Sequence, residues 1–124
     1  AEKVQAVDMW KEAEKLAAGI TLKNPRDTDF MRISTTYGRI KYQVIEQLWR
    51  IQMMLAEEQI NKKPLDENAA KAAVEAYEKS YEEWRQLKRD NPSCPTLYVD
   101  HEAKHTGPPF QTVLQPLKKR LGMN

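Results

Sequence analysis

Residues 28–61 form a long stretch without proline in which apolar side chains recur at intervals of three and four. Such spacing places the side chains along one face of an α-helix. One stripe consists of Phe30, Ile33, Tyr37, Ile40, Val44, Leu48, Ile51 and Leu55, and a second, on a neighbouring face, consists of Tyr42, Ile45, Trp49 and Met53. We therefore expect this helix to be the centre of a small all-α bundle, with neighbours on two sides.

A shorter amphipathic segment comes before the central one and is predicted to be helical from Glu2 to Ala18. Its expected core-facing residues are Val4, Val7, Trp10, Ala13, Leu16 or Ala17, and Ile20. Charged residues occupy the other side, which is typical of a helix packed on one face. Gly19 follows directly and is the expected C-terminal stop.

The central helix is predicted to begin with Asp27 or Thr28 as its N-cap, because proline disfavours helical dihedrals in the residue before it and Asn24-Pro25 is interpreted as a turn. Pro64 prevents its continuation. Gly38 is its weak point, since an interior glycine costs about 1 kcal/mol relative to alanine. Two interpretations of Gly38 stay open: a locally weak turn held by packing, or a site where another helix or the tail approaches closely.

A third helix is predicted to run from the N-cap Asp66 to Asp90, with small side chains at its start and aromatic ones towards its end. The stripe consists of Ala70, Ala73 or Val74, Tyr77, Tyr81, Trp84 and Leu87 or Lys88. In an up-down-up bundle with short turns, the end of the third helix lies near the start of the second. Its aromatic residues should therefore meet Phe30, Ile33 and Tyr37.

The same aromatic residues are the candidates for a binding surface, because aromatic rings can stack on sugars and peptides. The candidates are Tyr37, Tyr77, Tyr81, Trp84 and Tyr98. Aromatic residues on a helical stripe are usually core, and the core role is the preferred interpretation.

The character of the sequence changes after residue 90. Prolines recur between Asn91 and Pro109, so this segment is expected to be an irregular strap across the helices. Phe110 begins a short amphipathic helix that should end at Gly122, and Pro116 is expected to kink it or divide it. The predicted organisation is one domain: a three-helix bundle over residues 1–90, and a strap with a terminal helix over residues 91–124.

Length and charge limit the possible classes of function. The chain has 124 residues, which suits one domain, and its formal net charge is +2. Lys88-Arg89 and the segment Leu117–Arg120 form at most a modest basic patch, so a nucleic-acid partner is not expected. No apolar run is long enough for a membrane span, and no signal peptide is evident. The start at Ala1 is interpreted as a domain cut or, alternatively, a processed terminus.

Few residues are candidates for chemistry. His101 and His105 stand four apart and would share a helix face, the spacing of a metal-ligating pair. A third ligand would have to be Asp100 or Glu102, so two exposed loop histidines are the preferred interpretation. Cys94 needs a base to become a nucleophile and is interpreted as inert. No cofactor and no catalytic residue are predicted.

One resemblance to a known family lies at the junction between the third helix and the tail. The segment Tyr81-Glu-Glu-Trp84-Arg-Gln-Leu87, followed by Asn91-Pro-Ser-Cys-Pro-Thr-Leu-Tyr98, resembles the helical region after the catalytic barrel in large secreted bacterial proteins of the α-glucuronidase-like, polysaccharide-degrading kind. Such regions pack on the barrel and contribute to dimerisation or shape its cleft. The catalytic acids belong to the barrel, so no functional residue is carried over.

The leading hypothesis is therefore a non-catalytic accessory domain of a secreted carbohydrate-processing protein, with a neighbouring domain or a carbohydrate as partner. The alternative is a self-standing helical module, which could be cytoplasmic, that binds a helix or peptide beside the aromatic end. An enzyme that uses Cys94, His101 and His105 is the third and least favoured hypothesis.

Overall fold

The structure is a computed structural model that describes residues 2–92 and 108–123, with side chains described for 2–92 and 112–123. The described residues form four helices and no strands: α1 (Glu2–Ala18), α2 (Pro25–Asn61), α3 (Glu67–Asp90) and α5 (Pro108–Arg120). The predicted all-α bundle is confirmed.

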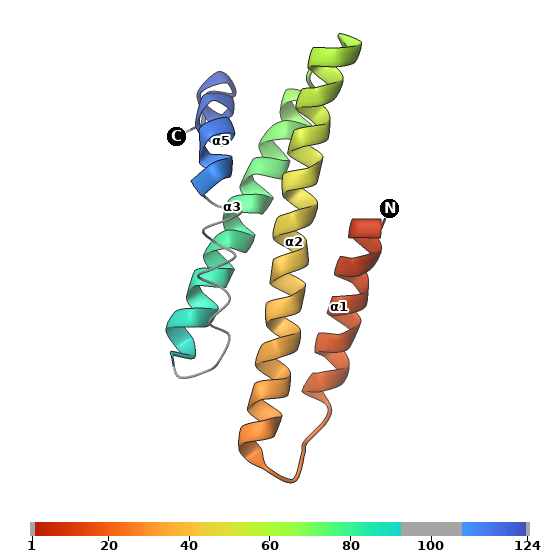
Figure 1. Cartoon of the computed structure of the whole chain (residues 1–124), viewed down its shortest axis with the longest axis vertical. Helices are drawn as coiled ribbons and strands as arrows, with labels where there is room; N and C mark the ends of the chain where they lie inside the picture. The colour runs from red at the N-terminus through yellow and green to blue at the C-terminus, as the bar shows by residue number, and fades with distance from the viewer. Residues whose placement is uncertain (1, 93–107, 124) are drawn as a thin grey trace.

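The long helix α2 is the centre of the arrangement (Figure 1). Helices α1 and α3 run antiparallel to it on its two sides, and both pack against it along their length. Helix α5 packs on α3 near the end where α3 begins. The expectation of a central helix with two neighbours is therefore correct.

The main core lies between α2, α3 and α5. Its buried members are Ile40, Val44, Ile51, Ala70, Ala73, Val74, Tyr77, Trp84, Leu114, Leu117 and Leu121. Most of the α2 and α3 members belong to the predicted stripes. Burial of apolar surface at about 25 cal/mol per Å² is the main term that holds the three helices together.

Helix α1 packs on the second predicted stripe of α2. Trp10 stacks on Tyr42 with ring centroids 6.2 Å apart, and the Lys3 ammonium lies 5.4 Å from the centroid of the Trp49 ring. Val7 and Ala17 are buried in the same contact. The two apolar stripes of α2 thus serve two different neighbours, one on each side.

One arginine joins all three long helices. Arg39 of α2 donates to Glu14 of α1 at 2.7 Å and to Glu83 of α3 at 3.2 Å, and also to Gln43 at 3.0 Å. Burial alone would lower the pKa of Arg39, but its bonds to Glu14 and the charges of both glutamates outweigh burial and raise that pKa. The guanidinium therefore stays charged and ties α1 and α3 to the same point of α2.

The start of α2 differs from the prediction. The helix begins at Pro25, and Oδ1 of Asn24 caps it by accepting a hydrogen bond from the Arg26 backbone N–H at 2.9 Å. Proline is well suited to the first helical position, where its missing N–H has no intrahelical partner. Asp27 and Thr28, the two predicted caps, lie inside the first turns, and Oγ1 of Thr28 accepts from the Leu22 backbone N–H at 2.9 Å.

The bounds of α1 and α3 agree with the prediction. Helix α1 ends at Ala18, directly before Gly19. Asp66 caps α3 as predicted, because its Oδ1 accepts a hydrogen bond from the Ala69 backbone N–H at 3.1 Å. Lys62, in the left-handed conformation with φ of 55°, ends α2.

Two expectations about apolar residues were wrong. Phe30 is 48% exposed and Ile20 is 45% exposed, although both were expected in the core. Tyr37 stacks on Trp84, and because α2 and α3 are antiparallel, Phe30 falls seven residues beyond that contact, opposite the C-cap Asn91. Helix α3 is therefore too short to cover Phe30.

Helix α5 begins two residues earlier than predicted, at Pro108, and continues through Pro116 without a break. Leu114, Leu117 and Leu121 are buried, at intervals of three and four that keep them on one face. The lost N–H bond at Pro116 is thus tolerated in a helix that packing holds in place.

Candidate functional site

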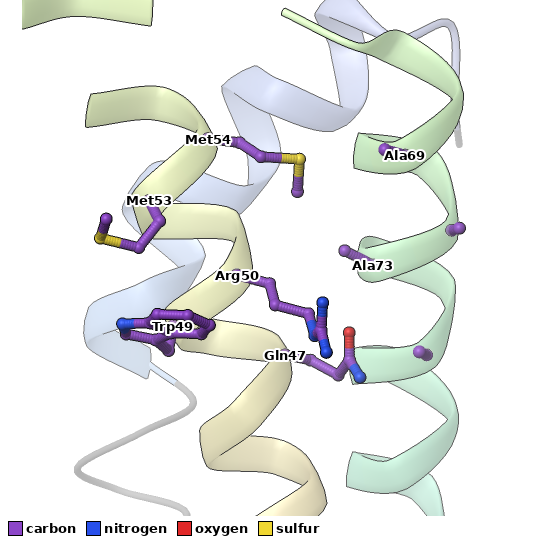
Figure 2. Close-up of a pocket in the computed structure, with 9 residues that line it drawn as sticks. Gln47, Trp49, Arg50, Met53, Met54, Ala69 and Ala73 are labelled. Carbon is purple, nitrogen blue, oxygen red and sulfur yellow. The ribbon is translucent and has the colours of Figure 1, made fainter. Parts of the chain in front are cut away.

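A groove lies between the second half of α2 and the first half of α3, and side chains of both helices line it (Figure 2). Its volume is about 570 Å³. The lining residues are Gln47, Trp49, Arg50, Met53 and Met54 of α2, and Ala69, Ala72, Ala73 and Ala76 of α3. A second hollow of about 290 Å³ shares Met53, Met54 and Ala69 with it and extends the groove to the turn at Lys63-Pro64.

The α3 side of the groove consists of alanines. Ala69, Ala72, Ala73 and Ala76 recur at intervals of three, one and three, so they lie on one face of the helix. No atom of an alanine side chain extends beyond Cβ, and the backbone of α3 is therefore reachable from the solvent side. Small residues on a helix face permit another helix to approach closely.

The α2 side carries larger and more adaptable side chains. Met53 is 44% exposed, and Met54 packs partly against the core. Unbranched thioether side chains fill irregular gaps and adjust to different partners. Figure 2 shows the Met54 side chain directed towards α3, with Trp49 and Met53 on the other side of α2. The groove thus has one flat wall of alanines and one deformable wall.

Polar groups at the edge of the groove are paired within α2. Arg50 donates from Nη2 and Nε to Glu46 at 2.8 and 3.1 Å. Glu57 accepts a hydrogen bond from Asn61 at 3.1 Å. Figure 2 shows the Gln47 and Arg50 side chains between α2 and α3 at one end of the groove, while Met54 and the alanines line the rest of that space with apolar groups. This distribution suits an apolar ligand surface with a polar margin.

Four of the aromatic candidates for a binding surface, Tyr37, Tyr77, Tyr81 and Trp84, form a cluster within the bundle, as the preferred core interpretation predicted. Tyr77 and Trp84 are each 1% exposed, whereas Tyr37 and Tyr81 are half-buried. Tyr37 and Trp84 stack at 6.1 Å, and Tyr81 lies 5.9 Å from Tyr77. Burial raises the pKa of Tyr77 to about 12. The rings of Tyr77 and Trp84 therefore belong to the core in this conformation.

The remaining predicted site residues lie outside the described part of the chain. They are Cys94, Tyr98, His101 and His105. Among residues 2–92 and 108–123, no group of three His, Cys, Asp or Glu side chains is placed to hold a metal ion. The two interpretations of His101 and His105, as exposed loop residues or as a metal-ligating pair, and the least favoured hypothesis of a Cys94 enzyme stay predictions.

Several basic residues of the predicted patch are engaged in ion pairs. Lys118 contacts Glu78 at 2.5 Å, Arg89 contacts Glu82 at 2.6 Å, and Arg120 forms a bidentate pair with Glu58. The hydrogen bond from Arg120 lowers the pKa of Glu58. These pairs neutralise much of the positive charge and tie α5 to α2 and α3.

Sequence reasoning missed the groove, although a signal was present. The alanines at 69, 72 and 76 alternate with the core positions Ala70, Ala73 and Tyr77, so small side chains cover a wider face than packing on α2 requires. When an apolar stripe is wider than packing against one neighbouring helix requires, it indicates that the helix makes a second contact.

In comparisons with known proteins, no family model, curated protein or solved structure matches this chain. None of the described helices is both long and apolar enough to cross a membrane. The functional argument therefore depends on the groove itself.

Proposed function

We propose that this chain is a helical interaction module that binds an amphipathic helix of a protein partner in the groove between α2 and α3. The observation that carries the proposal is the alanine wall formed by Ala69, Ala72 and Ala76, with Met54 of α2 directed towards it. An amphipathic helix lays its apolar face into such a groove through residues at i, i+3, i+4 and i+7.

The lining of the groove favours a helix over a small molecule. The two hollows share Met53, Met54 and Ala69 and together reach the turn at Lys63-Pro64, so a helix could lie along them. Ligand sites for small molecules usually enclose most of the ligand and place several polar groups around it. Here the alanine wall offers no side-chain polar group, and Arg50 and Glu57 have hydrogen bonds within their own helix.

Two kinds of partner are proposed for the groove. The resemblance of residues 81–98 favours a neighbouring domain of the same polypeptide, in a secreted carbohydrate-processing protein. The alternative is a separate protein. A carbohydrate ligand has less support, because Tyr77 and Trp84 bury the ring faces that stacking on a sugar would need. The open reading frame around this segment distinguishes the two kinds of partner, since an adjoining barrel would favour a neighbouring domain of the same polypeptide.

The groove itself is tested with a displayed library of amphipathic helices selected on the wild-type chain. The double substitution Ala69→Leu and Ala72→Leu fills the groove with side chains that suit a helix, so folding should be preserved. We expect selected peptides to shift the Met53 and Met54 methyl resonances of the wild type and to bind the filled variant at least tenfold more weakly.

The matched control is Ala18→Leu, an equal change at an exposed position of α1. It should leave peptide affinity unchanged. If no library member binds the wild type, or if selected peptides bind the filled variant as tightly, the groove is not a helix-binding site.

A further inference from the structure

The face of α2 that packs on α1 continues beyond the place where α1 begins. Lys3, in the first turn of α1, lies over Trp49, while α2 extends to Asn61. Figure 1 shows the start of α1 beside the middle of α2 and the upper part of α2 projecting past it. We call residues 50–61 the α2 overhang.

The overhang carries an apolar seam that continues the stripe facing α1. Trp49, Met53, Ala56 and Ile60 follow one another at intervals of four, three and four, the spacing of a coiled-coil seam. Met53 is 44% and Ile60 is 74% exposed, whereas Trp49 and Ala56 are partly buried. Trp49 and Met53 also line the groove described above, whereas Ala56 and Ile60 do not, so the seam overlaps the groove over part of its length.

We propose that the overhang is a self-association surface, on which the same segment of a second copy packs antiparallel about a twofold axis. In that register, Met53 lies opposite Ala56 of the second copy, and Trp49 lies opposite Ile60 of the second copy. A large side chain then meets a small one at the centre of the seam, as in well-packed helix pairs. A twofold axis uses the same surface on both copies.

Charges beside the seam favour a second copy in this orientation. Arg50 and Glu57 lie along one edge of the seam, whereas Gln52 and Gln59 lie along the other. In an antiparallel pair each edge faces its own counterpart, so Arg50 of each copy, which donates to Glu46 of its own helix, also comes to face Glu57 of the other. A parallel pair would set the charged edge against the glutamines, and both ion pairs would be lost.

The length of the overhang limits the expected affinity of self-association. Residues 50–61 span roughly 18 Å at about 1.5 Å per residue. Such a contact is smaller than the interfaces of permanent dimers, which bury about 2,000 Å² or more. The dimer should therefore form reversibly, with a population that rises with protein concentration. This inference stands independently of the helix-binding groove.

Charge reversal tests the proposal by sedimentation equilibrium of the full chain over a range of concentrations. Arg50→Glu places glutamate against Glu57 of the second copy, and Glu57→Arg places arginine against Arg50. Each variant alone should associate about tenfold more weakly than the wild type, since two attractive contacts become repulsive. An equimolar mixture of the two variants should regain the lost association, because every facing pair is again of opposite sign.

A second pair of variants tests the apolar seam. Ile60→Ser should weaken association, whereas Met9→Ser on α1, at a residue with the nearly equal exposure of 73%, should not. Both residues are exposed, so neither change should alter folding, which circular dichroism checks.

A wild type that stays monomeric at millimolar concentration, or a mixture of charge variants that does not associate, would overturn the proposal. All of these variants keep the alanine wall of the groove intact, so failure of self-association is distinguishable from failure of the helix-binding site.

Discussion

The indole ring of Trp10 lies directly on the backbone of Gly38. A Cβ atom placed on Gly38 would come within 2.4 Å of Cε3 of Trp10, closer than two carbon atoms can approach without a shift. Gly38 is buried in the interior of α2, and the six-membered part of the indole occupies the space that any side chain would need. The glycine therefore marks a close approach of α1 to α2, and not merely a weak turn.

Gly38→Ala is expected to destabilise the fold. In an isolated helix this substitution stabilises by about 1 kcal/mol. Here the added methyl group must displace Trp10 from Tyr42 and α2, and overpacking of this kind costs about 1–3 kcal/mol. Urea unfolding should show a net loss of stability. In a Trp10→Ala background the same substitution should become stabilising, because the obstacle is gone; a gain in the wild-type background would contradict the close contact.

Arg32 is expected to hold the C-terminal end of α1. Its guanidinium donates to three carbonyls at and just after the end of α1, those of Ala17 at 3.3 Å, Ala18 at 3.5 Å and Ile20 at 2.9 Å, of which the Ala17 carbonyl also accepts from the Ile20 backbone N–H. Arginine side chains commonly satisfy the last carbonyls of a helix. Arg32→Met keeps most of the apolar stem and should cost about 1 kcal/mol. Amide exchange should accelerate over residues 15–22 and stay unchanged in α3, whereas uniform acceleration would indicate a global effect.

Alkaline pH is expected to unfold the bundle partly through Tyr77. Burial raises the pKa of its phenol to about 12, against about 10 in an unfolded chain. Between these values the unfolded state loses the proton first, so the free energy of unfolding falls as pH rises from about 10 to about 12. Tyr77→Phe should flatten the pH dependence in this range when unfolding is followed by urea titration at fixed pH. Tyr42→Phe, at a half-buried ring, is the control.

Local signals in the sequence predicted the parts of the fold that depend on neighbours along the chain. The bounds of α1 and the Asp66 cap of α3 follow from amphipathic spacing and from side-chain chemistry within one turn. Pro25 was interpreted as part of a turn because it disfavours helix in the residue before it, yet that same property suits Asn24 as a cap. Either role is compatible with the dipeptide alone.

Features that depend on the length of a neighbouring helix could not be predicted in the same way. The exposure of Phe30 is decided by where α3 ends, and the exposure of Ile60 by where α1 begins, and neither is encoded next to the residue concerned. The groove shows the same limit: Ala70 and Ala73 were expected in the core and are buried there, but no role was predicted for the alanines at 69, 72 and 76. Spacing identifies an apolar face but not the element that covers it.

The attachment of α5 is expected to depend on pH at its charged end and on leucines at its centre. Leu114 and Leu117 are 1% and 5% exposed, so Leu114→Ala should cost about 2–5 kcal/mol of docking and release α5 from α3.

The hydrogen bond from Arg120 lowers the pKa of Glu58 in the folded chain, so this contact is present above the ordinary pKa of a glutamate and is lost as pH falls through the lowered value. The protection of the amides of residues 112–121 against exchange, relative to their intrinsic rates at each pH, should therefore be lower below pH 4 than at neutral pH. Glu58→Gln should abolish that loss of protection on acidification, whereas Glu82→Gln, which breaks an ion pair with Arg89 within α3, should leave it intact.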